Sequence, residues 1–379
     1  MEDRKGLTLS SSHYILIDCS GSMGGTKLDV AKEALKQYVN TLSDDDEVTL
    51  VSFGERGDVS IVFQQKKMDP KGKSEVSERI QQLSAGGGTP LYAAIREFVA
   101  LARDSSKNVS LLLLTDGQAS DVSDSEPYTV VIAPIVEKIS RSYVMGIGTD
   151  YDHTLLLALK NATNGEFENL VSPDQVLTKF QEISQRGRKV VAQAPRMMIK
   201  LTRGTSLNGI FRVEPQIQDL TNQVKMTKDG EYEVIMPDII ADEDQSYAMM
   251  LGLPARAEGE YREGRIHFQS LDYQPYDIVV GRSTQPTSLG EIDPAPRLIY
   301  NQAREQWIAT KAMTGDRAAL AETQRILATY RNNPEKATTM PISHLKTLES
   351  VTQVLTSKVP VDGKTQKAVT AKLTRKIEK

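Results

Sequence analysis

Residues 13 to about 185 alternate short apolar runs with stretches of helical spacing, and this alternation constrains the fold more than any other feature. The runs 14–18 and 109–115 are apolar at consecutive positions, so both faces of each strand must be covered. Residues 29–42 place their apolar side chains at helical spacing. Strands covered by helices on both faces form a doubly wound, mostly parallel sheet, and we therefore predict a Rossmann-like α/β domain. The other predicted strands are 48–53, 59–63 and 143–148, and the other predicted helices are 91–102, 153–161 and 174–184.

The pattern changes near Val190, where helical spacing gives way to short β-like runs. Turn signals such as Asp229-Gly230 and Glu263-Gly264 separate these runs, which predicts an antiparallel β-sandwich. A proline-rich stretch ends it, and helical patterns follow at 297–313, 317–330 and 342–357. We therefore predict an α/β domain over 10–187, a β-sandwich over 190–285, a C-terminal helical region over 295–358 and a basic, flexible tail over 359–379.

Oxygen-bearing side chains follow the predicted strands of the first domain. Asp18 ends the strand 14–18, and Ser20 and Ser22 come directly after it. Asp116 follows the strand 109–115, and Thr89 ends a glycine-rich loop just before a helix. In an open α/β sheet, ligands bind beyond the carboxyl ends of the strands, where the strand order reverses. We therefore expect these five side chains to meet there.

The chemistry of these five residues favours a hard metal ion. Mg²⁺ takes oxygen ligands in near-octahedral arrangement and tends to keep some of its water. Two carboxylates and three neutral hydroxyls would leave the ion short of negative charge. A carboxylate from a partner protein would then complete both the charge and the coordination shell. The prediction is therefore a Mg²⁺ site, with Mn²⁺ or Ca²⁺ as alternatives, that receives an Asp or Glu from a partner.

The three segments Asp18-x-Ser20-x-Ser22, Thr89-Pro90 and Thr115-Asp116-Gly117 resemble the metal-ion-dependent adhesion site of von Willebrand factor A domains. The resemblance covers about residues 10–185. It implies that the hydroxyls of Ser20, Ser22 and Thr89 contact the metal, and that Asp18 and Asp116 act directly or through water. The second half of the chain resembles bacterial proteins likened to calcium-activated chloride channels or inter-alpha-trypsin inhibitor heavy chains, which also place a β-sandwich and helices after an A domain.

Two catalytic interpretations fail on spacing. A nucleophile elbow needs G-x-S-x-G, and neither Ser20 nor Ser22 lies in that pattern. A phosphate-binding loop needs lysine directly after its last glycine, but Thr26 separates Gly25 from Lys27. All four histidines lie outside the motif segments. We therefore expect no enzymatic activity in this chain.

Other conspicuous residues are expected to be structural. Cys19 alternates with Asp18 and Ser20, so we expect its side chain in the core rather than in a redox switch. The acidic run 44–47 is interpreted as a solvated loop rather than a second cation site. His153 is interpreted as a surface or helix-start residue, and Trp307 as a core residue on a helical stripe. Three acids beyond the Thr115-Asp116-Gly117 motif form either a polar loop or a charged rim that selects partners: Asp121, Asp124 and Glu126.

The net charge of −4 and the pI of about 5.8 disfavour a nucleic-acid binder. No apolar run is long enough for a membrane span, and residues 1–12 do not read as a signal peptide, so a cytoplasmic location is expected. The leading hypothesis is a metal-dependent protein-interaction module. The alternative is a subunit of an assembly driven by a separate ATPase, as in magnesium chelatase, or of a kinase and phosphatase signalling system. A surface adhesin is a third hypothesis.

Overall fold

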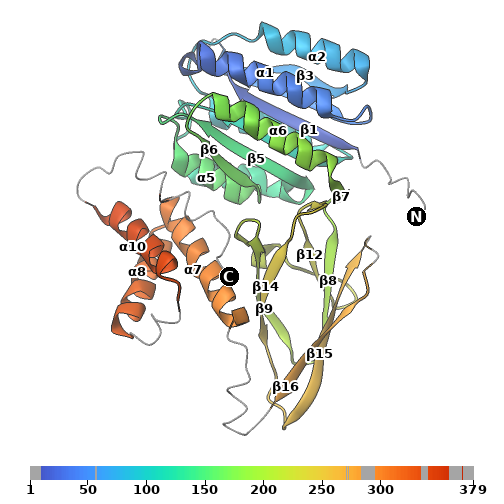
Figure 1. Ribbon diagram of the computed structural model, residues 1–379, viewed down its shortest axis with the longest axis vertical. Helices are drawn as coiled ribbons and strands as arrows, with labels where there is room; N and C mark the ends of the chain where they lie inside the picture. The colour runs from blue at the N-terminus through green and yellow to red at the C-terminus, as the bar shows by residue number, and fades with distance from the viewer. Residues whose placement is uncertain are drawn as a thin grey trace. The chain divides into compact units, whose positions relative to one another are not determined.

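The computed structural model describes residues 10–55, 58–269, 271, 273–282, 295–333, 340–357 and 369. The described residues up to Gln193 form one compact unit, and those from Ala194 onward form a second (Figure 1). Each unit has its own hydrophobic clusters and is described by itself below.

The first unit contains a six-stranded sheet with the order β3-β2-β1-β4-β5-β6. All neighbouring strands are parallel except β3, which runs antiparallel to β2 at one edge. The strands are β1 (Ser11–Asp18), β2 (Glu47–Phe53), β3 (Val59–Lys67), β4 (Asn108–Thr115), β5 (Ile139–Ile147) and β6 (Glu166–Leu170), and the short β7 (Val190–Ala192) follows later in the chain.

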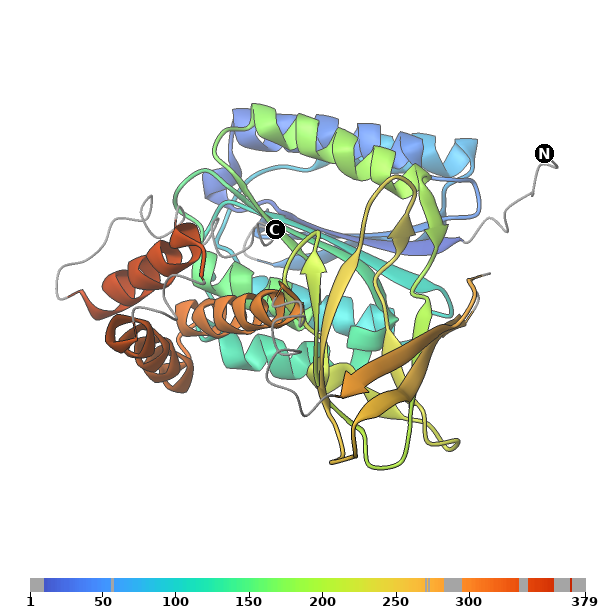
Figure 2. The same ribbon diagram turned by 60° about the horizontal axis from the view of Figure 1, so that its bottom comes forward.

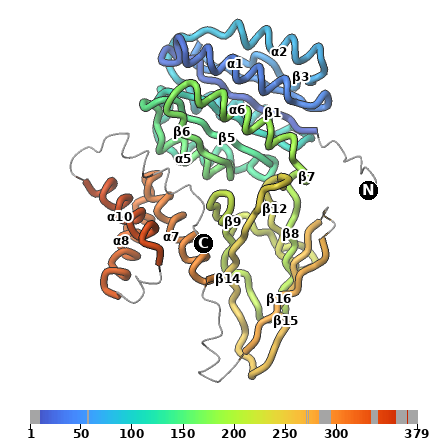
Figure 3. Tube along the Cα trace, in the orientation of Figure 1, coloured from blue at the N-terminus to red at the C-terminus, as the bar shows by residue number. Residues whose placement is uncertain are grey.

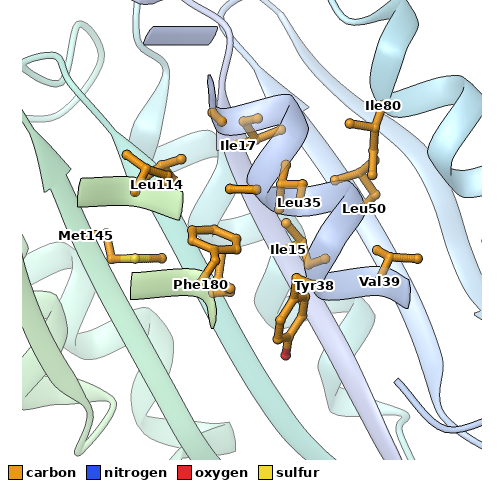
Figure 4. Close-up of a cluster of buried hydrophobic side chains, with 14 of the residues drawn as sticks. Ile15, Ile17, Leu35, Tyr38, Val39, Leu50, Ile80, Leu114, Met145 and Phe180 are labelled. Atoms are coloured by element: carbon orange, nitrogen blue, oxygen red, sulfur yellow. The ribbon is translucent and has the colours of Figure 1, made fainter. Parts of the chain in front are cut away.

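Helices cover both faces of this sheet, which explains why its strands are apolar at consecutive positions (Figure 2). Ile15 and Ile17 of β1 point to one face, where Leu35, Tyr38 and other buried side chains fill the core (Figure 4). Tyr14 and Leu16 point to the opposite face. The first face is covered by α1 (Thr26–Thr41), α2 (Pro70–Gln82) and α6 (Asp174–Arg188), and the second by α3 (Leu91–Arg103), α4 (Ser125–Ile132) and α5 (His153–Ala162).

The strand order reverses between β1 and β4. The chain leaves β1 toward β2 on one side and returns to β4 on the other. At such a point the loops that follow the two strands diverge and leave a crevice at their carboxyl ends. Asp18 is the last residue of β1, and Asp116 directly follows β4, so both carboxylates belong to this edge.

The second unit contains two antiparallel sheets, with the orders β10-β9-β14 and β11-β12-β8-β15-β16 (Figure 3). Ile210 from the first sheet and Ile199 and Val234 from the second belong to one buried cluster. The strands are β8 (Arg196–Leu201), β9 (Ser206–Glu214), β10 (Gln218–Asp219), β11 (Lys225–Met226), β12 (Tyr232–Ile235), β13 (Ile239–Ile240), β14 (Ser246–Gly252), β15 (Gly259–Gln269) and β16 (Tyr276–Arg282).

The described part of the second unit also contains the helices α7 (Ala295–Met313), α8 (Arg317–Asn332) and α10 (Ile342–Thr356). Trp307 and Tyr300 of α7 belong to one buried hydrophobic cluster with Phe211 of β9, so the predicted core role of Trp307 is confirmed. The carboxylate of Glu305 on α7 links this helix to α8 and α10. It accepts a hydrogen bond from the Tyr330 hydroxyl at 2.9 Å, and it pairs with His344 Nε2 at 3.0 Å.

The structure confirms the predicted fold class: a mostly parallel sheet between helices, with further antiparallel sheets and C-terminal helices. The sequence analysis missed α2, α4 and β6. The reason is clearest for α2, where only Gly72, Val76 and Ile80 are buried among thirteen mostly polar residues. Within the described residues, no helix combines the length and the apolar character needed to cross a membrane. Residues 359–379, the predicted flexible tail, lie outside the described part apart from Val369.

Asp46 corrects the prediction of a solvated acidic loop. Asp44 and Asp45 are exposed, but Asp46 is buried at the amino end of the sheet. Its carboxylate accepts hydrogen bonds from the Ser11 amide and the Ser43 amide, both at 2.8 Å. His13 Nε2 lies 3.7 Å away. Burial alone would raise the pKa of Asp46, but the partnership with His13 and the two amides hold it well below its usual range.

Asp46→Asn is expected to lower the free energy of unfolding at neutral pH by about 1–3 kcal/mol, because one of the two amides would face an NH₂ group. The pKa of Asp46 is depressed on folding, so its contribution is present above the unfolded-state pKa and is lost as the pH falls toward the folded-state pKa. The difference between the wild type and Asp46→Asn in urea unfolding should therefore shrink below about pH 4.

Asp45→Asn is the matched control, because it removes the same charge from an exposed neighbour. It should leave the unfolding free energy nearly unchanged. Equal effects of the two substitutions would contradict the structural role of Asp46.

Candidate metal centre

The loops that follow β1 and β4 bring four of the five predicted residues into one hydrogen-bonded chain. Asp18 Oδ1 accepts a hydrogen bond from the Ser20 amide at 2.7 Å. The hydroxyl oxygens of Ser20 and Ser22 lie 3.1 Å apart. The Ser22 hydroxyl donates to Asp116 Oδ1 at 2.7 Å. Two carboxylates and two hydroxyls from sequence positions almost a hundred residues apart are therefore connected without a gap.

Thr89, the fifth predicted residue, joins this group through the space beside Gly117. A Cβ atom built on Gly117 would lie 2.7 Å from Thr89 Oγ1 and 3.6 Å from Ser22 Oγ. The hydroxyls of Thr89 and Ser22 therefore both lie next to the space beside Gly117. The backbone of Thr89 is held by Ser120, whose hydroxyl accepts from the Thr89 amide at 3.0 Å and whose amide donates to the Thr89 carbonyl at 2.9 Å.

Main-chain hydrogen bonds hold the loop after β1 against its neighbours. The Cys19 amide donates to the carbonyl of Phe53 at the end of β2. The Gly86 amide donates to the Cys19 carbonyl at 2.8 Å, and the Gly21 amide donates to the Gly87 carbonyl at 3.1 Å. The loop that carries the two serines is therefore clamped between the end of β2 and the glycine-rich loop before α3.

Gly54 makes this close approach sterically feasible. Its φ of +101° lies in the region that side chains disfavour, and a Cβ there would lie 2.6 Å from the Gly88 carbonyl oxygen and 2.6 Å from the Ser20 amide nitrogen. Only a residue without a side chain fits between these two backbone segments.

The site concentrates negative charge in a buried place. Asp18 and Asp116 are fully buried, and Ser20 and Thr89 are nearly so, whereas Ser22 is exposed. Burial raises the pKa of Asp18, and the charge of Asp116 adds to the rise, while hydrogen bonds from Ser20 and Thr115 oppose it. A nearby cation would therefore stabilise both carboxylates, and the exposed Ser22 marks the side from which it would enter.

The donor set fits a hard divalent cation. All five side chains offer oxygen, and two of them are charged, which suits Mg²⁺, Mn²⁺ or Ca²⁺ better than a soft metal. Among the residues that the structure describes, no three His, Cys, Asp or Glu side chains gather closely enough to hold a metal by themselves. A metal centre here would therefore depend on the hydroxyls as well as the carboxylates.

Two residues of the site were not predicted. The Thr115 hydroxyl donates to Asp18 Oδ2 and so orients that carboxylate. The Lys27 ammonium, from the first turn of α1, pairs closely with Asp116 Oδ2. Both lie within motifs that the sequence analysis quoted, but Lys27 was considered only as part of a phosphate-binding loop. Its distance of five residues from Ser22 gave no direct sign that it would turn back to the site.

The other conspicuous residues have structural roles. Cys19 is fully buried, as expected, and burial raises the pKa of its thiol to about 12. The Asp121 carboxylate caps α3 by accepting from the amides of Tyr92 and Ala93, so it is not a free rim charge. Glu126 lies in the first turn of α4 rather than in a loop. His153 begins α5, as expected, but it is buried rather than at the surface.

Residues 14–186 match the family model of the von Willebrand factor type A domain. The matched segment spans β1 to α6 and includes the whole site described above. By this match, residues 14–186 are similar to a von Willebrand factor type A domain, and this segment is called the VWA domain below. Domains of this family, hereafter VWA domains, generally mediate metal-dependent protein–protein interactions.

Similar proteins extend the comparison beyond the VWA domain. An uncharacterized protein from Synechocystis is 22% identical over 323 residues, which cover 81% of this chain and 75% of that protein. A von Willebrand factor A domain-containing protein from Dictyostelium discoideum is 28% identical over 199 residues, covering 52% of this chain but only 21% of the relative. The chain therefore spans about a fifth of the length of that relative.

The solved structure of a von Willebrand factor type A protein from Catenulispora acidiphila is similar over nearly the whole chain. Its TM-score is 0.75 at 18% identity, and the match covers 98% of this chain and 90% of that one. At this identity the likeness shows the fold alone. The VWA domain together with further sheets and helices is thus an architecture that this chain shares with a solved structure.

Gly54→Ala is expected to destabilise the VWA domain by about 1–3 kcal/mol, because the new Cβ would strain a positive-φ backbone and collide with two neighbouring segments. Thermal unfolding of the purified chain measures the effect. Gly21→Ala is the control, since a Cβ on Gly21 would meet its nearest atom, the Gly87 carbonyl oxygen, at an ordinary 3.6 Å. Similar melting temperatures for the two variants would show that the Gly54 contact is not needed.

Proposed function

We propose that this chain is a metal-dependent protein-interaction module whose VWA domain binds one divalent cation, Mg²⁺ first among the candidates, and through it an acidic side chain of a partner protein. The observation that carries the proposal is the continuous arrangement of Asp18, Ser20, Ser22 and Asp116 at the carboxyl edge of the sheet. The match of residues 14–186 to a family of metal-dependent interaction domains supports it.

In this proposal the hydroxyls of Ser20, Ser22 and Thr89 and the carboxylates of Asp18 and Asp116 hold the metal. When bound, the metal supplies a Lewis-acidic positive charge that attracts an anionic group. The chain's own residues fix the oxygens: Thr115 orients Asp18, and Ser120 holds the backbone of Thr89. Because three of the five donors are neutral, an Asp or Glu of the partner is the matching ligand.

The proposal includes no catalytic step by this chain. No histidine is part of the described site: His13 lies at the opposite, amino end of β1, where its Nδ1 is 2.8 Å from the Tyr38 hydroxyl. The Ser22 hydroxyl donates to the Asp116 carboxylate, and in this proposal that carboxylate is a metal ligand rather than a general base. The site is therefore suited to coordination rather than to acyl transfer.

Ser22→Ala is expected to weaken Mg²⁺ binding at least about tenfold, because the loss of an outer-shell partner alone costs about 10–100-fold and Ser22 is a direct donor in this proposal. Isothermal titration of the full chain with MgCl₂ measures the affinity. Truncation of Ser22 also removes one hydrogen bond to the buried Asp116, so the melting temperature in EDTA should fall by only about 2–4 °C per kcal/mol lost.

Ser140→Ala is the matched control, because Ser140 lies near the amino end of β5, at the opposite edge of the sheet. It should bind Mg²⁺ like the wild type. Equal affinities for Ser22→Ala and the wild type would refute the proposed donor set.

Chelation tests the interaction itself. Partners captured on the immobilised wild-type chain in MgCl₂ should be lost in excess EDTA, and Asp18→Asn should lose the same partners while remaining folded by circular dichroism. Mass spectrometry of the eluates identifies them. Partners that survive both EDTA and Asp18→Asn would show that the interaction does not pass through the metal.

A further inference from the structure

Lys27 places a positive charge directly on a carboxylate of the metal centre. Its ammonium pairs with Asp116 Oδ2, and it also lies 3.3 Å from the carbonyl oxygen of Ser22. The Asp116 side chain is fully buried, whereas 30% of the Lys27 side chain is exposed. Lys27 therefore extends inward from the rim, and its ammonium compensates the charge of the buried Asp116 carboxylate.

Both oxygens of Asp116 are in use in this arrangement. Oδ1 accepts from the Ser22 hydroxyl, and Oδ2 accepts from the Lys27 ammonium. A buried carboxylate without a compensating charge is strongly unfavourable, so the ammonium stabilises the site as it stands. The same charge acts against a second cation that approaches the same carboxylate.

We propose that Lys27 is a built-in counter-cation: it stabilises the metal-free centre and competes with the divalent ion for Asp116, so that it sets how tightly the metal is held. This inference rests on the proposed metal-binding function and assigns a further residue to that site. Metal loading then exchanges one cation for another at Asp116. The centre is thereby kept folded in both states, at the cost of a weaker affinity for the metal.

Two consequences separate this role from simple packing. Removal of the ammonium should tighten metal binding, because the ion no longer has a competitor. It should also destabilise the chain only when the metal is absent, because the metal supplies the missing charge when it is bound. A residue that only packs would lower stability equally in both conditions.

The test uses the full chain and three variants. Lys27→Met removes the charge and keeps most of the side-chain length, and Lys27→Arg keeps the charge. Lys36→Met is the matched control on the same helix, where Lys36 pairs with Glu33 away from the site. Each protein is stripped with EDTA, dialysed and titrated with MgCl₂ by calorimetry, and its melting temperature is measured in EDTA and in saturating MgCl₂.

We expect Lys27→Met to bind Mg²⁺ about tenfold more tightly than the wild type, a gain of about 1.4 kcal/mol. Its melting temperature should lie below that of the wild type in EDTA and should match it in saturating MgCl₂. Lys27→Arg and Lys36→Met should bind Mg²⁺ within about twofold of the wild type, because the charge at the site is unchanged.

Equal or weaker Mg²⁺ binding by Lys27→Met would overturn the inference and leave the metal centre intact. A melting temperature lowered equally in EDTA and in MgCl₂ would also overturn it, since that result describes packing alone. If the wild type shows no Mg²⁺ binding at all, the proposed metal centre fails first and the inference fails with it.

Discussion

The structure around the site depends on two carboxylates buried next to each other at the point where the strand order reverses. Asp18 ends β1 and Asp116 follows β4, and neither is exposed to solvent. Charge in such a place must be compensated, and the fold supplies hydroxyl and amide donors from the loop after β1 and from the end of β4, together with one ammonium. The loops around the two acids are closely packed, and Gly54 allows this because a Cβ there would collide with Gly88 and Ser20.

The sheet provides the rigid support for this arrangement. Residues of β1 alternate between two buried clusters, and each cluster is closed by three helices. Because both faces are packed, β1 and β4 cannot shift relative to each other without opening a core. The positions of Asp18 and Asp116 are therefore fixed by apolar side chains that never touch the site.

The sequence was sufficient for the fold class and for the convergence of the five oxygen-bearing residues, because both follow from regular periodicity and from the topology of open α/β sheets. It was insufficient wherever one side chain decided the outcome. In the sequence Asp46 could not be distinguished from its exposed neighbours, but in the structure it is buried and interacts with two backbone amides and His13. Lys27 looked like a failed phosphate-loop lysine, and its contact with Asp116 depends on how α1 begins, which spacing does not encode. The polar α2 was missed because few of its residues face the core.

The loop after β1 is fastened by bonds between main-chain atoms, from Cys19 to Phe53 and to Gly86, and from Gly21 to Gly87. Hydrogen bonds between main-chain atoms do not depend on which side chains the loop carries. A substitution at an exposed position such as Thr26 can therefore leave the positions of the oxygen-bearing side chains unchanged. Such a scaffold suits loop grafting. Exposed residues at the rim could be replaced to favour a new target while the buried residues of the site are kept.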